Sequence, residues 1–271
     1  MSKKRNKNKP TMAATADKHE LYEKSVQNAA AEIDFVDETF RKRRNRTPAK
    51  LREDFCGTAQ VCCEWVRRRN TNIAHGVDID PEVMQWGREK HLTKLVNGAA
   101  ARVHLHNRDV LKIKAEPVDV VLAMNFSYWL FKDRAVMKSY FKKVYNGLVD
   151  DGIFFLDAFG GYEAFQEMEE STKYKKYTYI WDQESYNPIN GDCTFHIHFK
   201  FKDGSRLDNA FTYEWRLWTL PELMEMLREC GFHPVVYWEG TDKHGEGNGV
   251  FTAETRGEAD ASWVAYIVAE K

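Results

Sequence analysis

The chain has 271 residues, of which 43% are hydrophobic and 13% aromatic; this composition supports a substantial core and excludes an intrinsically disordered protein. Its 40 basic and 41 acidic residues leave a formal net charge of -1, so no overall charge steers it toward nucleic acid. No apolar run approaches the ~18 residues that a transmembrane helix requires, so no membrane span is predicted.

Cysteine usage and the first residues indicate the compartment. The five cysteines are odd in number and form no C-x-x-C pair, so neither a disulfide framework nor a zinc site is predicted. The basic start MSKKRNKNKP is followed by no apolar segment, unlike a secretory signal. We therefore expect a soluble protein in the reducing cytoplasm.

The amino-terminal region has two predicted parts. Residues 1–16 are polar, basic and alanine-rich, and we expect a disordered basic tail. From residue 17 to 47, hydrophobic residues recur near helical spacing and predict a helical cap of one or two helices. Its end carries a basic cluster, defined as Arg41, Lys42, Arg43, Arg44 and Arg46. Such cations suit the negative end of a helix dipole, and contact with phosphate or nucleic acid is the alternative.

Residues 48–271 alternate between strand and helix patterns. Strands are predicted over 50–55, 72–77, 102–106, 118–124, 153–157, 232–238 and 263–269. Helices are predicted over 60–69, 81–96, 134–148 and from the capping box Thr219-Leu-Pro-Glu222 to Cys230. This alternation predicts an α/β fold with a doubly wound, mostly parallel seven-stranded sheet and helices on both faces.

The alternation is interrupted at about 170–215 by strand-like segments without helices. Asp203-Gly204 is a strong hairpin turn within this region. We therefore predict an antiparallel β insertion of two or three strands in the domain formed by residues 48–271.

Candidate ligand groups follow four successive strands. In an open α/β sheet, ligands bind beyond the carboxyl ends of the strands. Asp78 follows the first loop by about 20 residues, the spacing of an acid that binds ribose hydroxyls; the Asp78/Asp80 pair also suits the start of the next helix. The four groups are Cys56-Gly57-Thr58, Asp78-Ile79-Asp80, Asp109-Val110 and Asn125-Phe126-Ser127-Tyr128.

A dinucleotide-binding enzyme shares this early pattern but requires more glycine. Its G-x-G-x-x-G loop lets backbone N–H groups reach a pyrophosphate. Gly57-Thr58-Ala59-Gln60-Val61 lacks this spacing. A cofactor without phosphate is therefore favoured.

Four segments together resemble class I, Rossmann-like S-adenosylmethionine-dependent methyltransferases: EDFCGTA (53–59), GVDIDPEVM (76–84), RDV (108–110) and GLVDDGIFFLD (147–157). The resemblance covers about residues 50–157 and extends weakly to 271. It implies S-adenosyl-L-methionine as cofactor, no metal, and cofactor contacts from Glu53, Cys56, Gly57, Thr58, Asp78, Ile79, Asp109, Val110 and Asn125. Phe55 and Ala59 stand where the family has glycine, which predicts a variant turn.

The residues after the fourth strand are expected to face the methyl acceptor. Asn125 and Tyr128 share the N-x-x-Y spacing of the N-P-P-Y motif in methyltransferases that act on amino groups of nucleic acid, although both prolines are absent. The aromatic residues Phe126, Tyr128, Trp129 and Phe159 either favour a sulfonium by cation–π attraction or pack in the core. By resemblance, the β insertion with Trp181, Arg216 and Trp218 would form a lid.

The sequence therefore predicts a methyltransferase that acts on a small-molecule acceptor by in-line displacement, a reaction that depends on alignment and needs no metal cluster. His196 and His198 lack a third ligand at metal-binding spacing. Two alternatives stay open. One is an RNA or protein methyltransferase docked by the basic amino-terminal region, and the other is a non-catalytic module that binds S-adenosylmethionine.

Overall fold

The computed structural model describes residues 9–243 and 247–271, which fold into two compact units. The larger unit consists of Asn28–Ala164 and Arg216–Lys271, and the smaller contains the described residues up to Gln27 with Phe165–Trp215. The predicted helical cap is thus divided between the units after Gln27. Residues 1–8 of the predicted tail lie outside the described residues.

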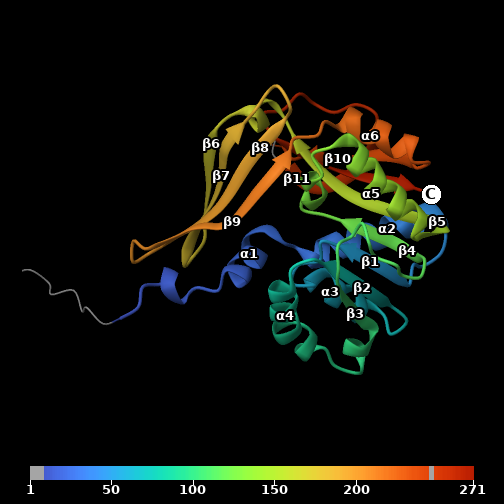
Figure 1. Ribbon diagram of the computed structural model, residues 1–271, viewed down its shortest axis with the longest axis horizontal. Coiled ribbons are helices and arrows are strands. Elements are labelled where there is room, and N and C mark those ends of the chain that lie inside the picture. Colours follow the sequence, from blue (N-terminus) through green and yellow to red (C-terminus); the bar gives the residue numbers. More distant parts are fainter. Residues whose placement is uncertain (1–8, 244–246) are drawn as a thin grey trace, which may run out of the picture. The chain divides into compact units, whose positions relative to one another are not determined.

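The larger unit is built on one eight-stranded sheet with the order β11-β10-β12-β5-β4-β1-β2-β3 (Figure 1). Strands β3, β2, β1, β4 and β5 are parallel. Beyond β5, β12 pairs antiparallel with both β5 and β10, so β10 runs in the same direction as β5, and β11 pairs antiparallel with β10. The strands are β1 (Lys50–Asp54), β2 (Ile73–Asp78), β3 (Val103–Asn107), β4 (Val118–Ala123), β5 (Leu148–Gly160), β10 (His233–Thr241), β11 (Gly247–Glu254) and β12 (Trp263–Glu270). The helices are α2 (Ala29–Arg44), α3 (Gln60–Arg68), α4 (Pro81–Lys90), α5 (Arg134–Asn146) and α6 (Leu220–Glu229).

This architecture confirms the predicted doubly wound, mostly parallel fold and its seven strands. The eighth strand, β11, was not predicted because its side chains are almost all exposed, so no alternation of buried and exposed residues marks it. The helix predicted over 81–96 ends earlier, at Lys90. Leu95 has extended backbone, with φ of -75° and ψ of 131°, which excludes a continuous helix to residue 96.

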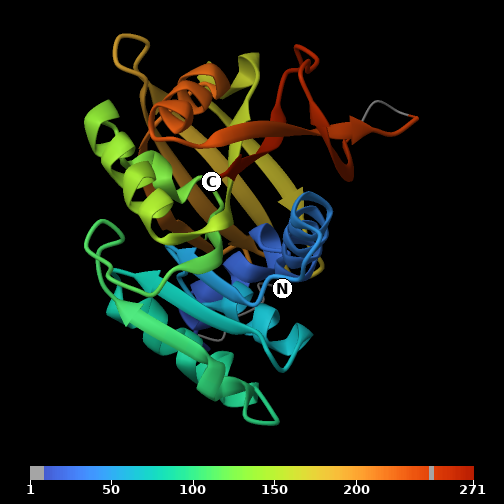
Figure 2. The same ribbon diagram turned by 90° about the vertical axis from the view of Figure 1, so that its right-hand side faces the viewer.

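Strand β1 shows how helices cover both faces of the sheet. Alternate side chains of a strand point to opposite faces, so the side chains of Asp54 and Glu53 contact helices on different faces of the sheet. The Tyr140 hydroxyl of α5 donates to Asp54 Oδ2 at 3.0 Å, and the Cys62 amide of α3 donates to Glu53 Oε2 at 3.1 Å. Helices α3 and α5 therefore pack on opposite faces; Figure 2 shows α5 in green and α2 in blue on opposite sides of the sheet.

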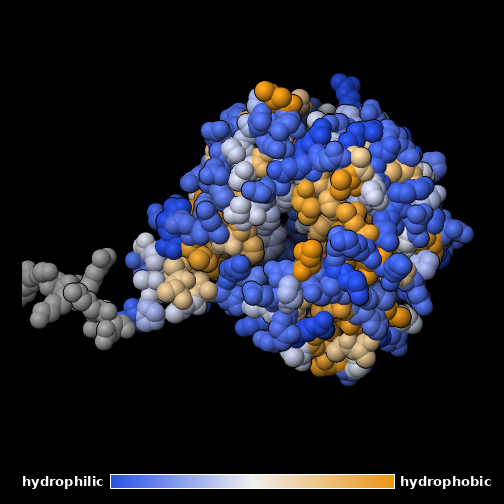
Figure 3. Space-filling view, viewed as in Figure 1, coloured by the Kyte–Doolittle hydropathy of each residue, from blue (hydrophilic) through white to orange (hydrophobic). Residues whose placement is uncertain are grey.

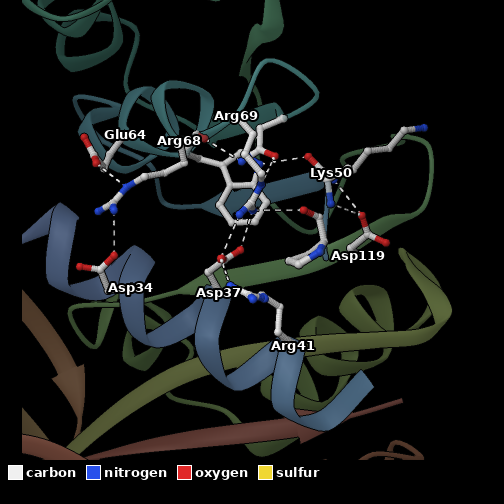
Figure 4. Close-up of polar contacts among 12 residues, drawn as sticks. Asp34, Asp37, Arg41, Lys50, Glu64, Arg68, Arg69 and Asp119 are labelled. Carbon is white, nitrogen blue, oxygen red and sulfur yellow. Dashed lines mark hydrogen bonds and ion pairs between the residues drawn. The ribbon is translucent and has the colours of Figure 1, made fainter. Parts of the chain in front are cut away.

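Helix α2 is fixed to the larger unit by its core face and by ion pairs. Ile33, Val36 and Phe40 are at most 1% exposed. Around them, Arg68 of α3 binds Asp34 at 2.8 Å, and Arg69 binds both carboxylate oxygens of Asp37 at 2.5 and 2.9 Å (Figure 4). The bidentate geometry of Arg69 is the stronger kind of guanidinium–carboxylate contact.

The basic cluster at the end of α2 is neutralised by acidic residues of the same unit. Arg43 and Arg44 both bind Glu270, and Arg46 binds Asp119 at 2.8 Å and Asp151 at 2.7 Å. The hydrogen bond to Asp151 is the main cause that raises the pKa of Arg46. Arg41 and Lys42 pair with acids one helical turn earlier, Asp37 and Glu38. These contacts join the helix end to the sheet.

The smaller unit is a four-stranded antiparallel sheet with α1 (Lys18–Val26) on its hydrophobic face. The strands are β6 (Met168–Lys173), β7 (Tyr177–Tyr186), β8 (Asp192–Phe201) and β9 (Arg206–Arg216). The prediction of two or three strands missed β6, which is mostly exposed. The tail prediction is also incomplete, since Met12 and Ala13 donate backbone hydrogen bonds to Asp203 and Ser205 of the β8–β9 hairpin.

The surface gives no sign of a membrane segment in the described residues. None of their helices combines the length and apolar composition of a membrane span. The face shown in Figure 3 is largely hydrophilic, with separate hydrophobic patches.

Gly87 allows a close contact between α4 and the β1–α3 loop. A Cβ placed there would lie 2.1 Å from the Thr58 carbonyl oxygen. We predict that Gly87→Ala lowers the free energy of unfolding by about 1–3 kcal/mol, the usual cost of overpacking, as measured by urea denaturation. Glycine-to-alanine changes inside helices otherwise gain about 0.5–1 kcal/mol, so a stabilised variant would contradict this contact.

Candidate functional site

The loop that joins β1 to α3, residues 55–59, has left-handed backbone at alternate positions. The φ angles are 60° at Phe55, 49° at Gly57 and 58° at Ala59. These are the three positions where the resemblance expects glycine, so the backbone keeps the conformation that favours glycine. A left-handed residue with a side chain costs roughly 1–2 kcal/mol.

Packing of the two side chains offsets part of this cost. The Phe55 ring lies 6.0 Å from that of Phe131 and 5.8 Å from that of Tyr140. Ala59 is fully buried. The turn therefore differs from the family's turn in its residues at positions 55 and 59 but keeps the left-handed backbone. Phe55 anchors it to the α5 side of the sheet.

One side of this loop is packed and the other is open. Thr58 contacts α4 at Gly87, as described above. A Cβ placed at Gly57 would meet no atom within 4 Å. The space in front of Gly57 can therefore accept a ligand that approaches the backbone closely.

Asp78, at the end of β2, holds the loop in place. Its Oδ2 accepts a hydrogen bond from the Gly57 amide at 2.8 Å, and its Oδ1 accepts one from the Asp80 amide at 2.9 Å. Burial raises the pKa of Asp78, and these amide donors oppose the shift. The helix-capping role belongs to Asp80, which accepts from the Glu82 and Val83 amides. The structure thus brings Asp78 and the loop together.

The end of β3 lies beside the end of β2. The Asn107 side chain donates to the Ile79 carbonyl at 2.9 Å, and the Arg108 amide donates to that of Asp78. Asp109 accepts from the Leu111 amide at 2.9 Å. Ile79 is 73% exposed and Val110 is 4% exposed, so Ile79 presents an apolar side chain at this edge.

The turn after β4 contains two successive left-handed residues, Asn125 and Phe126, both with φ of 56°. Asp157 of the neighbouring β5, three residues before the strand ends, holds them: its carboxylate accepts from the Asn125 amide at 2.7 Å and the Phe126 amide at 2.9 Å. The Asn125 side chain makes no hydrogen bond to another described residue. Asn125 is therefore available at the same edge as Gly57 and Asp78.

Tyr128 lies in the core next to this turn. Its side chain is fully buried, and its hydroxyl donates to the Asp157 carbonyl at 2.7 Å. Trp129 is also fully buried and stacks on Phe159 at 4.7 Å, and Phe126 contacts Phe159 at 4.8 Å. Core packing thus accounts for these aromatic residues. Contact between Tyr128 and an acceptor stays a prediction.

Three buried acidic side chains near this edge come from different elements. Burial raises the pKa of Glu53 in β1 to about 7, against two donors from Cys62. Burial likewise raises the pKa of Asp157 to about 7. The pKa of Glu32 in α2 is raised well above its ordinary value by burial and then by the charges of Glu53 and Asp157.

Sequence reasoning named only Glu53 of these three acids. Asp157 is the last residue of the strand predicted over 153–157, so the rule that selected Asp78 would also have selected it. Glu32 lies within a helical pattern, where an acidic residue carries no distinguishing signal. Cys56 was named, but its side chain is buried with a raised pKa, which leaves only its backbone for ligand contact.

His196 and His198 of the smaller unit are held by carboxylates. His196 Nε2 lies 2.9 Å from Glu184, and His198 Nε2 lies 3.1 Å from Asp182. Among residues 9–243 and 247–271, no three His, Cys, Asp or Glu side chains are grouped to hold a metal ion. These histidines therefore brace neighbouring strands.

Asp157 makes stability depend on pH in a defined direction. It keeps its proton up to a pH of about 7 in the folded protein but loses it near the ordinary value of 3.8 when unfolded. Unfolding then releases a proton, so stability falls as pH rises between these values. We predict that Asp157→Asn flattens this decline by up to about 1.4 kcal/mol per pH unit, measured by urea unfolding at pH 5, 6 and 7.

The matched control for this change is Asp150→Asn, which removes an exposed carboxylate from the same strand. It should leave the pH dependence as in the wild type. Equal slopes for wild type and Asp157→Asn would contradict the buried, protonated state of Asp157.

No family model matches the chain, and no curated protein matches it in sequence. Solved structures resemble it over most of its length. An S-adenosylmethionine-dependent methyltransferase from Clostridium acetobutylicum is 16% identical with a TM-score of 0.69, and the match covers 93% of this chain and 96% of that one. The amino pentose methyltransferase CalS10 from Micromonospora echinaspora is 15% identical with a TM-score of 0.66, covering 93% and 95%.

The sugar N-methyltransferase KedS8 from Streptoalloteichus is 16% identical with a TM-score of 0.62, and the match covers 94% of each chain. At such low identity these similarities concern the fold. The predicted resemblance is confirmed at that level: the chain has the fold of the class I S-adenosylmethionine-dependent methyltransferases.

Proposed function

We propose that the protein transfers a methyl group from S-adenosyl-L-methionine to a small-molecule amine. The observation that carries this proposal is the edge formed by the open side of Gly57, Asp78 at the end of β2, and the free side chain of Asn125 after β4. When bound there, the cofactor supplies an electrophilic methyl group on its sulfonium.

The loop itself favours this cofactor over a dinucleotide. A pyrophosphate would need free backbone N–H groups. The amides of Cys56, Gly57 and Ala59 already donate to the Val77 carbonyl, the Asp78 carboxylate and the Cys56 carbonyl. These three amides are therefore not free to bind a phosphate, whereas the open space at Gly57 remains for a ligand. This suits a cofactor without phosphate.

Other residues of the edge fit the remaining parts of the cofactor. The Asp78 carboxylate has lone pairs left for ribose hydroxyls, and exposed Ile79 would cover one face of the adenine, with Asp109 and Val110 at its rim. Gln60, in the first turn of α3, has a buried Oε1 without a hydrogen-bond partner among the described residues. Such an acceptor is stabilised when a ligand donor reaches it.

The chain contributes to methyl transfer mainly by alignment. In-line displacement gains most of its rate from holding the reacting groups close and oriented. Asp157 fixes the Asn125 backbone in its left-handed conformation, so Asn125 can hold an acceptor amine in one position. An uncharged amine needs no strong base before it reacts.

The acceptor class is supported by the surface and by the names of structural neighbours. CalS10 is an amino pentose methyltransferase and KedS8 a sugar N-methyltransferase. The basic cluster at residues 41–46 is paired with acids of its own unit, so it provides little unpaired charge for RNA. We therefore favour a small amine, such as an amino sugar, over a macromolecular acceptor.

Asp78→Ala tests the cofactor assignment. It removes the ribose contact and the brace on Gly57, and we expect a loss of S-adenosylmethionine affinity of roughly tenfold or more, as for loss of charged hydrogen bonds. Isothermal titration calorimetry measures the change. Asp80→Asn, which keeps a good helix cap, is the control and should bind normally. No binding by folded wild-type protein would refute the proposed function.

The acceptor is tested by incubating the protein with methyl-labelled donor and a cell extract, followed by separation by size. Label in a low-mass amine is the expected outcome. Label in RNA or protein would instead support a macromolecular acceptor. Tight cofactor binding without any labelled product would support a non-catalytic module.

A further inference from the structure

Helix α2 brings an unpaired carboxylate to the candidate site. Glu32 lies in the first turn of α2, behind the Asn28 cap. Its Oε1 atom is buried and has no hydrogen-bond partner among the described residues. A buried acceptor without a donor is costly by itself, so its retention here requires an explanation.

The position of Glu32 is rigid. One turn later on α2, Phe35 packs against Tyr266 at 4.5 Å and Phe155 at 6.1 Å. The ion pairs of Asp34 with Arg68 and of Asp37 with Arg69, at the end of α3, fix the helix from the other side. Glu32 therefore cannot relieve its isolation by movement of the helix.

The charged groups around Glu32 are themselves acidic. Glu53 of β1 faces α3, where Cys62 donates to it, and Asp157 lies near the end of β5. The charges of both residues raise the pKa of Glu32. The arginines of α2 begin at Arg41, about 13 Å further along the helix, and are paired. Arg52 points to the opposite face, where it binds Asp54. A positive group at Glu32 must therefore come from a ligand.

We propose that Glu32 binds the α-ammonium group of the methionine part of S-adenosylmethionine, beside Glu53 and Asp157. This inference rests on the proposed function. An ammonium supplies both the N–H donor and the charge that the isolated Oε1 lacks. A sulfonium has no N–H donor and would leave Oε1 unsatisfied, so Glu32 recognises the amino-acid end of the ligand.

Proton linkage follows from this arrangement. In the free protein, the pKa of Glu32 is raised by burial and by its two acidic neighbours. The carboxylate that pairs with an ammonium is ionised, so binding releases a proton and affinity rises with pH. Calorimetric titration in buffers with different ionisation enthalpies detects this release.

Glu32→Gln tests the proposal with three ligands. S-adenosylmethionine and S-adenosylhomocysteine both carry the α-ammonium, whereas 5′-methylthioadenosine lacks the amino-acid part. We expect the variant to bind the first two roughly 10- to 100-fold more weakly, as for a lost charged hydrogen bond. Its affinity for 5′-methylthioadenosine should be unchanged, and the released proton should disappear.

Glu38→Gln is the matched control, because it makes the same change on the exposed face of the same helix, and it should bind all three ligands normally. Equal affinities of wild type and Glu32→Gln for S-adenosylmethionine would overturn this inference, as would an equal loss for 5′-methylthioadenosine. If Glu32→Gln does not fold, Glu32→Asp replaces it as the test. Its shorter side chain withdraws the carboxylate from the ligand, so it should also weaken the binding of S-adenosylmethionine and S-adenosylhomocysteine but not that of 5′-methylthioadenosine. Absence of binding by wild type would instead refute the proposed function.

Discussion

Carboxylates that hold left-handed backbone at strand ends are the constraint on which the candidate site depends. Asp78 binds the amide of Gly57, and Asp157 binds the amides of Asn125 and Phe126. In each case the acid lies at or near the carboxyl end of one parallel strand, and the turn follows the neighbouring strand. The parallel sheet brings these ends to one edge, and the acids then fix the turns in conformations that side chains disfavour.

Buried acids gather at this edge. Burial of a carboxyl group disfavours its charged form, which is why the pKa values of Glu53 and Asp157 rise to about 7. On the opposite face of β1, Asp54 is buried as well, but Arg52 and the Tyr140 hydroxyl pair with it. One face of the strand thus contains a balanced ion pair, and the other contains acids that a cationic ligand would balance.

Much of the fold follows from local patterns. Alternating strands and helices, the Asp80 cap before Pro81 and the capping box of Thr219 and Glu222 are all present as expected. The elements that escaped prediction, β6 and β11, have no buried face and so no period of two. Their pairing partners lie on other strands, and local sequence does not encode that pairing.

The sequence by itself determined the fold class and the residues at successive strand ends, because strand ends are local and the sheet places them together. Only the tertiary structure decided what each side chain does there. It buries Tyr128 in the core and places Asp157 where it binds the turn after β4. It also pairs arginines of the basic cluster with Glu270, Asp119 and Asp151, and leaves Oε1 of Glu32 without a hydrogen-bond partner among the described residues. Burial and charge pairing depend on groups far apart in the chain, so no local pattern reports them.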